Sequence, residues 1–171
     1  MKLNKLQKKI GISFKDDKLL IQALTHKSFD TKNNYEKLEF LGDRVLGFVI
    51  SKKLLELYPN EKVGMIDKKL ANLVNKNKCF EIGKELELDN YILTGNTEKK
   101  KKVNIEKKII SDCCESLIGA IYIDKGFEVS SKFILNYWKN YLNLSDVTVI
   151  DSKTRLQAVS YTHLTLPTKQ D

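Results

Sequence analysis

YEKLEFLGDRVLGFVI, residues 35–50, predicts a single helix whose two faces differ in chemistry. At about 100° per residue, five apolar side chains fall on one stripe, which we expect to face the core. These side chains are Leu38, Leu41, Val45, Phe48 and Val49. The opposite ridge is mixed and carries the acids Glu36, Glu39 and Asp43 beside Phe40, Gly47 and Ile50.

The acidic ridge predicts more than a solvated surface. Glu36, Glu39 and Asp43 stand at positions i, i+3 and i+7, where like charges on a helix repel one another. We therefore expect a cationic group on this ridge, and the apolar residues beside the acids predict contact with another surface. The alternative is an acidic face that only keeps the protein in solution, which is the common case for a lone pair of acids.

A second stretch, SDCCESLIGAIY at residues 111–122, repeats the arrangement. Asp112 and Glu115 share a helix face with the small residues Ser116 and Gly119. The opposite face is an apolar stripe, formed by Cys114, Leu117, Ile118 and Ile121. Small residues let two helices approach closely, so this helix sets its acids where a neighbouring helix could pack.

The two stretches together predict a metal site. If Gly47 and Gly119 mark a helix crossing, four carboxylates converge in one pocket, namely those of Glu39, Asp43, Asp112 and Glu115. Oxygen ligands at this density suit Mg²⁺ or Mn²⁺. Such a site would act on phosphate.

Both stretches also resemble known motifs. YEKLEFLGDRVLG resembles the signature of the ribonuclease III family, and SDCCESLIGAIY resembles the second acidic motif of that family. The similarity extends over most of residues 1–143 and includes ALTHKS at residues 23–28. It implies an all-α endonuclease domain that forms a two-fold dimer through the helix of residues 35–50. It also implies hydrolysis of double-stranded RNA with a divalent metal.

The resemblance assigns roles to individual residues. The metal-binding set is Glu39, Asp43, Asp112 and Glu115, of which Asp43 and Glu115 are the expected catalytic residues. The expected cofactor is Mg²⁺, for which Mn²⁺ could substitute, with two ions per active site during catalysis. Phe40 is expected at the dimer interface. Glu36 has three open roles: it could position water at the metal, contact the dimer partner, or simply be solvated.

Composition points to a polyanionic partner. The 171 residues carry a formal charge of +8, although the excess of lysine could equally reflect nucleotide bias in the genome. No apolar run approaches the roughly 18 residues of a membrane span, and the N-terminus lacks a signal-peptide core, so a cytoplasmic protein is expected. Cys79, Cys113 and Cys114 lack the spacing of a zinc site and predict buried, reduced thiols.

The rest of the chain predicts further helices. Gly11 should end a first helix, Asp16 or Asp17 should cap a second, and Pro59 should end the helix of residues 35–50 near residue 57. Further helical periodicity runs through residues 63–74, 80–88 and 129–142, and Gly126 should end the second acidic helix. Almost no alternation of period two precedes residue 145, so we predict an all-α fold.

One basic loop and the end of the chain lie outside the two motifs. Lys99, Lys100, Lys101 and Lys102 precede the second acidic helix, and they are either a solvated loop or a contact to RNA phosphates. Residues 144–150 are expected to be a linker, and residues 151–157 resemble the opening of a double-stranded-RNA-binding domain. Residues 158–171 do not continue that domain and resemble a translated transposon-end sequencing adapter, so a non-native tail is expected there.

The predicted function is a metal-dependent endoribonuclease that cleaves RNA duplexes, in RNA processing such as maturation of ribosomal RNA precursors. A catalytically silent RNA-binding dimer is the alternative, and the presence of all four acids disfavours it. A metal-storing or structural helical bundle fits a basic chain with a compact acidic cluster less well.

Overall fold

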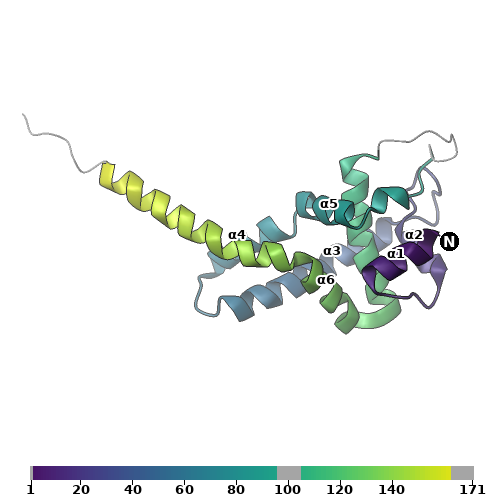
Figure 1. Cartoon of the computed structure of the whole chain (residues 1–171), viewed down its shortest axis with the longest axis horizontal. Coiled ribbons are helices and arrows are strands. Elements are labelled where there is room, and N and C mark those ends of the chain that lie inside the picture. Colours follow the sequence, from purple (N-terminus) through teal and green to yellow (C-terminus); the bar gives the residue numbers. More distant parts are fainter. Residues whose placement is uncertain (1, 96–104, 163–171) are drawn as a thin grey trace, which may run out of the picture. The chain divides into compact units, whose positions relative to one another are not determined.

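The computed structural model describes the backbone of residues 2–95 and 105–162 and the side chains of residues 3–95 and 105–144 (Figure 1). The helices are α1 (Lys2–Ile10), α2 (Asp17–Ala23), α3 (Glu36–Leu57), α4 (Val63–Leu73), α5 (Lys76–Glu85), the short 3-10 helix η1 (Leu88–Asn90) and α6 (Lys107–Thr162). Within these residues the extended structure is one isolated parallel bridge, which pairs Thr25 with Leu93. The all-α prediction is confirmed.

The predicted helix ends are also found. Gly11 follows α1 with φ of 67°, a conformation that favours glycine. Asp16 caps α2, and its carboxylate accepts a hydrogen bond from the backbone N–H of Lys18. α3 ends at Leu57, two residues before Pro59. None of the helices within the described residues is long and apolar enough to cross a membrane.

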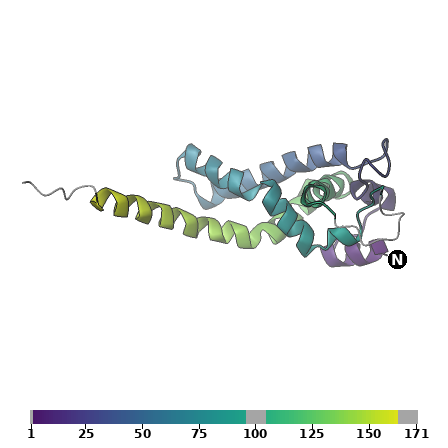
Figure 2. The ribbon, with the colours of Figure 1, turned by 90° about the horizontal axis from the view of Figure 1, so that it is seen from above.

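The chain divides into two compact units, Met1–Tyr137 and Trp138–Asp171. Within the first unit, the first half of α6 is the central helix, and α1, α3 and α5 surround it in both views (Figures 1 and 2). Residues 110–121 are all buried, so this helix is covered on every side and not only along one apolar stripe. At Gly126 the backbone leaves the helical conformation, as predicted.

The linker predicted at residues 144–150 and the nuclease domain predicted at residues 1–143 stay predictions. α6 continues through residues 144–150 to Thr162, since no glycine or proline interrupts residues 127–162. The assignments of 151–157 to an RNA-binding domain and of 158–171 to a non-native tail stay predictions. Residues 163–171 lie outside the described residues, as do Lys99, Lys100, Lys101 and Lys102.

Two details of α3 differ from the sequence-based prediction. Phe48 is 61% exposed, whereas Ile50, expected on the opposite ridge, is fully buried. The helix crossing lies at Gly42 and not at Gly47, because the backbone of α6 at Glu115 and Gly119 passes directly against Gly42. A crossing centred on Gly42 rotates the buried stripe, which now consists of Leu38, Gly42, Val45, Leu46, Val49, Ile50 and Leu54.

Candidate functional site

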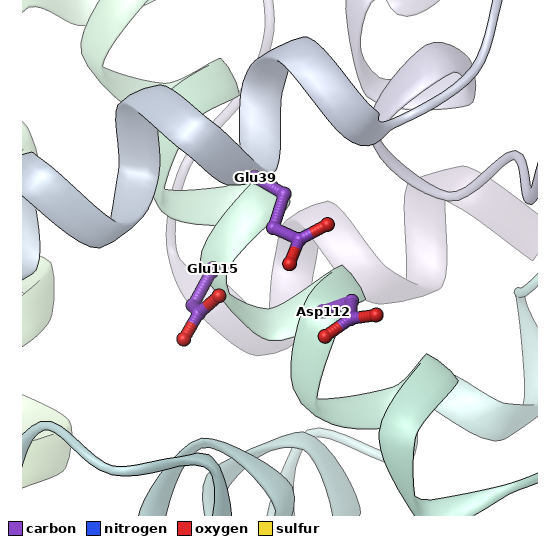
Figure 3. Close-up of side chains that lie close together, drawn as sticks. All are labelled: Glu39, Asp112 and Glu115. Carbon is purple, nitrogen blue, oxygen red and sulfur yellow. The ribbon is translucent and has the colours of Figure 1, made fainter.

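Three of the predicted carboxylates meet where α3 crosses α6. Glu39 comes from α3, and Asp112 and Glu115 come from one face of α6. One oxygen of each lies within 4.8 Å of the others, and the three side chains point into a common space (Figure 3). The crossing at Gly42 and Gly119 creates this geometry, because helices with side chains at those positions could not come so close.

A cation lies among these oxygens, as the acidic ridge predicted. The Nζ atom of Lys76 is 2.9 Å from Glu39 Oε1, 2.6 Å from Asp112 Oδ1 and 2.7 Å from Glu115 Oε2. Lys76 is the first residue of α5. Nothing in the sequence singles out this lysine over its neighbours, because residues 68–78 contain several lysines with no distinctive spacing.

The carboxylates of α6 are buried despite their charge. The side chains of Asp112 and Glu115 are each 3% exposed. Burial raises the pKa of the Glu115 carboxyl, and the hydrogen bond from Lys76 acts in the opposite direction. Burial alone would lower the pKa of the Lys76 ammonium, but its hydrogen bonds to Asp112, Glu115 and Glu39 outweigh that effect and raise it.

Cys79 is a second residue at the site that sequence reasoning did not place there. Its Sγ atom lies 3.5 Å from Glu115 Oε1 and donates to it, while Lys76 bonds the other oxygen of the same carboxylate. A hydrogen bond with Cys114 and burial raise the pKa of the Cys79 thiol, so it stays protonated. The prediction of buried, reduced cysteines is confirmed for all three.

Asp43 lies beside the three carboxylates and is not one of them. It lines an open cavity of about 470 Å³ together with Glu36, Glu39, Phe40, Arg44, Lys76 and Glu115. Its carboxylate pairs with the guanidinium of Arg44, the next residue in the chain. The structure therefore brings three of the four predicted ligands together and places the fourth on the wall of the same cavity.

Glu36 and Phe40 also line this cavity, and both side chains are exposed. Glu36 forms an ion pair with Lys27 at 3.1 Å, in which both side chains are more than half exposed. Phe40 is 63% exposed, and the Arg44 guanidinium stacks 4.2 Å from the centre of its ring. A large exposed aromatic ring on α3 is consistent with the expected interface.

The donor set fits a hard divalent cation. Three carboxylates and one ammonium leave a net charge of about −2 in a space that already holds a cation among carboxylate oxygens. Oxygen-only ligands of this kind suit Mg²⁺ or Mn²⁺ better than Zn²⁺, which takes nitrogen and sulfur. The Cys79 thiol donates a hydrogen bond to Glu115 and stays protonated, so it does not change this preference.

The family follows from comparison with known proteins. The family model described as Ribonuclease-III-like matches residues 16–142, which span both acidic helices. The chain belongs to the ribonuclease III family. It is 59% identical over 162 residues to Ribonuclease 3 of Pelagibacter ubique, with 94% of this chain and 72% of that protein covered. Ribonuclease 3 of Hahella chejuensis is 43% identical over 159 residues, with 91% and 70% covered.

Solved structures of the family share the fold. The nuclease domain of ribonuclease III from Campylobacter jejuni superposes with a TM-score of 0.74 at 37% identity, covering 80% of this chain and 96% of that domain. That structure was described for flexibility in a region involved in dimer formation. The ribonuclease III resemblance seen in the sequence is therefore confirmed, and the chain is an endoribonuclease of the double-strand-specific type.

Proposed function

We propose that this ribonuclease III chain hydrolyses phosphodiester bonds in double-stranded RNA with Mg²⁺ or Mn²⁺ bound by Glu39, Asp43, Asp112 and Glu115. The observation that carries the proposal is the convergence of Glu39, Asp112 and Glu115 around one cation position. Two bound ions would supply an activated water and stabilise negative charge on the leaving 3′ oxygen.

The side chains of this chain would hold and complete that arrangement. Asp112 and Glu115 are fixed on a buried helix, so their oxygens keep their positions when substrate arrives. Asp43 stands one turn after Glu39 and would join the set by giving up its pairing with the exposed Arg44. In the reaction, the oxygen of water bonds to phosphorus as the bond to the 3′ oxygen breaks, and a proton passes to that oxygen.

The proposed substrate is duplex RNA, which such a site would recognise by the shape of the double helix. The deep major groove of an RNA helix hides its base edges, so recognition rests on phosphates and 2′-hydroxyls, and sequence preference should be weak. The formal charge of +8 favours binding of a polyanion. Lys99, Lys100, Lys101 and Lys102 are proposed contacts to RNA phosphates, and ribosomal RNA precursors in the cytoplasm are the proposed substrates.

A two-fold dimer would place one cluster on each RNA strand. We assign its interface to α3, where Phe40 and Phe48 are both more than 60% exposed. In the ribonuclease III family such a pair of sites leaves short 3′ overhangs. Glu36, paired with Lys27, is proposed to support the site from the wall of the cavity.

Cleavage of a long RNA duplex tests the function. The wild-type chain should cut the duplex with Mg²⁺ and not with a chelator, and Glu115→Gln should bind duplex RNA but not cut it. Glu128→Gln is the matched control, because Glu128 is an exposed glutamate paired with Lys132 away from the cluster. Binding without cleavage by the wild type would support the catalytically silent RNA-binding dimer, and absence of both would support a structural bundle.

A further inference from the structure

Lys76 lies at the centre of the carboxylate cluster although it belongs to neither acidic motif. Its ammonium group bonds one oxygen from each of Glu39, Asp112 and Glu115, at 2.6 to 2.9 Å. The three acids come from two helices and the lysine from a third, α5. In this arrangement a single side chain neutralises part of the charge of all three.

The lysine side chain is more exposed than the three acids that it contacts. The side chain of Lys76 is half exposed, whereas those of Asp112 and Glu115 are each 3% exposed. Asn75 fixes the start of α5, because its side chain accepts a hydrogen bond from the backbone N–H of Lys78 at 3.1 Å. Because Lys76 lines the open cavity, its ammonium group can turn into that cavity without movement of any helix, whereas the carboxylates of Asp112 and Glu115 are held in the packed interior.

A metal ion and this ammonium group would need the same place. Mg²⁺ binds carboxylate oxygens at about 2.1 Å, so an ion held by Glu39, Asp112 and Glu115 would lie where Lys76 Nζ now lies. Two cations cannot share that position, because they repel each other and compete for the same oxygens. One of them must leave when the other binds.

We propose that Lys76 is a built-in competitor of the catalytic metal, which holds the three carboxylates in place before the ion arrives and sets the ion concentration that the enzyme needs. The inference rests on the proposed function only in taking Glu39, Asp112 and Glu115 as metal ligands. Displacement would turn the ammonium group into the cavity lined by Phe40 and Arg44.

Lys108 is the control residue, because it lies near the carboxylate cluster without entering it. Its Nζ atom is 3.8 Å from Asp112 Oδ2, and its side chain is 80% exposed. It is paired with one carboxylate from the outside and does not occupy the space between the three. Replacing Lys108 also removes one positive charge near the cluster. It therefore separates direct competition for the carboxylate oxygens from the general effect of charge on metal binding.

The test is a calorimetric titration of the chain with Mn²⁺ alone, without RNA. Lys76→Met keeps an unbranched side chain as far as the ε position and removes the ammonium group, and it should lower the Kd for Mn²⁺ by about tenfold or more. Lys108→Met should change that Kd by less than about threefold. In a chelator Lys76→Met should melt below the wild type, and saturating Mn²⁺ should close that gap.

A measurement on the wild type keeps the inference testable if Lys76→Met does not fold. In NMR spectra of the metal-free chain labelled with ¹⁵N-lysine, the hydrogen-bonded Lys76 ammonium group should give a slowly exchanging signal that Mg²⁺ abolishes. An unchanged or raised Kd for Mn²⁺ in Lys76→Met, or a Lys76 signal that persists at saturating Mg²⁺, would overturn the inference. A wild type that binds Mn²⁺ but cuts no duplex would instead refute the proposed function and leave the competition intact.

Discussion

The backbone of Gly42 on α3 lies against that of Gly119 on α6, and neither position has room for a Cβ atom. A Cβ on Gly42 would overlap the carbonyl oxygen of Glu115 and lie 2.9 Å from the amide nitrogen of Gly119. A Cβ on Gly119 would overlap the carbonyl oxygen of Leu38. Since Glu39 and Glu115 stand next to these contacts, the close crossing both stabilises the fold and sets the spacing of the site.

We therefore predict that Gly42→Ala lowers the free energy of unfolding by at least about 2 kcal/mol, because backbone atoms on both sides cannot move aside as a flexible side chain would. Metal affinity should fall with it, since α3 and α6 must separate. Denaturant unfolding and Mn²⁺ titration measure the two effects. Gly64→Ala is the control, because a Cβ at Gly64 on α4 meets nothing within 4 Å, and it should stay within about 0.5 kcal/mol of the wild type. Equal stability of the two variants would contradict the packing described for the crossing.

The cap of α2 gives a second prediction. Asp16 Oδ1 accepts a hydrogen bond from the backbone N–H of Lys18 at 2.9 Å, so Asp16→Ala should lower the free energy of unfolding by about 1 kcal/mol. Asp16→Asn keeps an oxygen acceptor at the same place and should lose only about 0.3 kcal/mol. Chemical unfolding of the wild type and the two variants measures these differences. A decrease in the free energy of unfolding as large in Asp16→Asn as in Asp16→Ala would argue against capping by the side-chain oxygen.

Features that depend on local sequence could be predicted before the structure was known. Helical spacing alone predicts that Asp112 and Glu115 share one face of their helix and that Glu39 lies on the acidic ridge of its own. Their convergence was predicted only for a crossing of the two helices, which was expected at Gly47 and lies at Gly42. The helix ends at Gly11, Asp16 and Pro59 were predictable, since caps and breakers act locally.

The remaining features depend on tertiary contacts. Gly42 and Gly47 both offer a small residue on α3, and only the path of α6 selects Gly42 as the crossing. That choice also buries Ile50 and exposes Phe48, opposite to the predicted stripe. Lys76 reaches the acids because α5 packs beside them, which no spacing within a lysine-rich stretch could indicate.

The exposed aromatic ring on α3 gives a third prediction. Phe40→Asp should shift the chain from dimer towards monomer, because a charge would have to be buried where an apolar ring meets the partner. Light scattering at low protein concentration measures the change in mass. Phe29→Asp is the control, since Phe29 is 43% exposed and lies outside α3, and its mass should match that of the wild type. An unchanged mass for Phe40→Asp would contradict the assignment of the dimer interface to this part of α3.

The turn before α3 gives a prediction about pH. Asp30 Oδ1 accepts hydrogen bonds from the backbone N–H groups of Lys32 at 2.8 Å and Asn33 at 2.9 Å. The bonds from Asn33 and Lys32 lower the pKa of the Asp30 carboxyl below its usual value. A carboxyl group with a lowered pKa in the folded state binds its proton more weakly than in the unfolded chain. Its contribution to stability is therefore complete above the unfolded pKa and is lost as the pH falls through the folded pKa.

Asp30→Asn keeps an oxygen acceptor for the turn and removes the charge, so it resembles the protonated carboxyl group. The wild type should melt above Asp30→Asn at about pH 7, and the difference should shrink to nothing as the pH falls towards about 2. Thermal unfolding followed by circular dichroism across that range measures the difference. Asp67→Asn removes a negative charge from the exposed face of α4 and controls for the change in net charge. A difference between wild type and Asp30→Asn that stays constant with pH would show that the turn depends on the shape of the side chain and not on its charge.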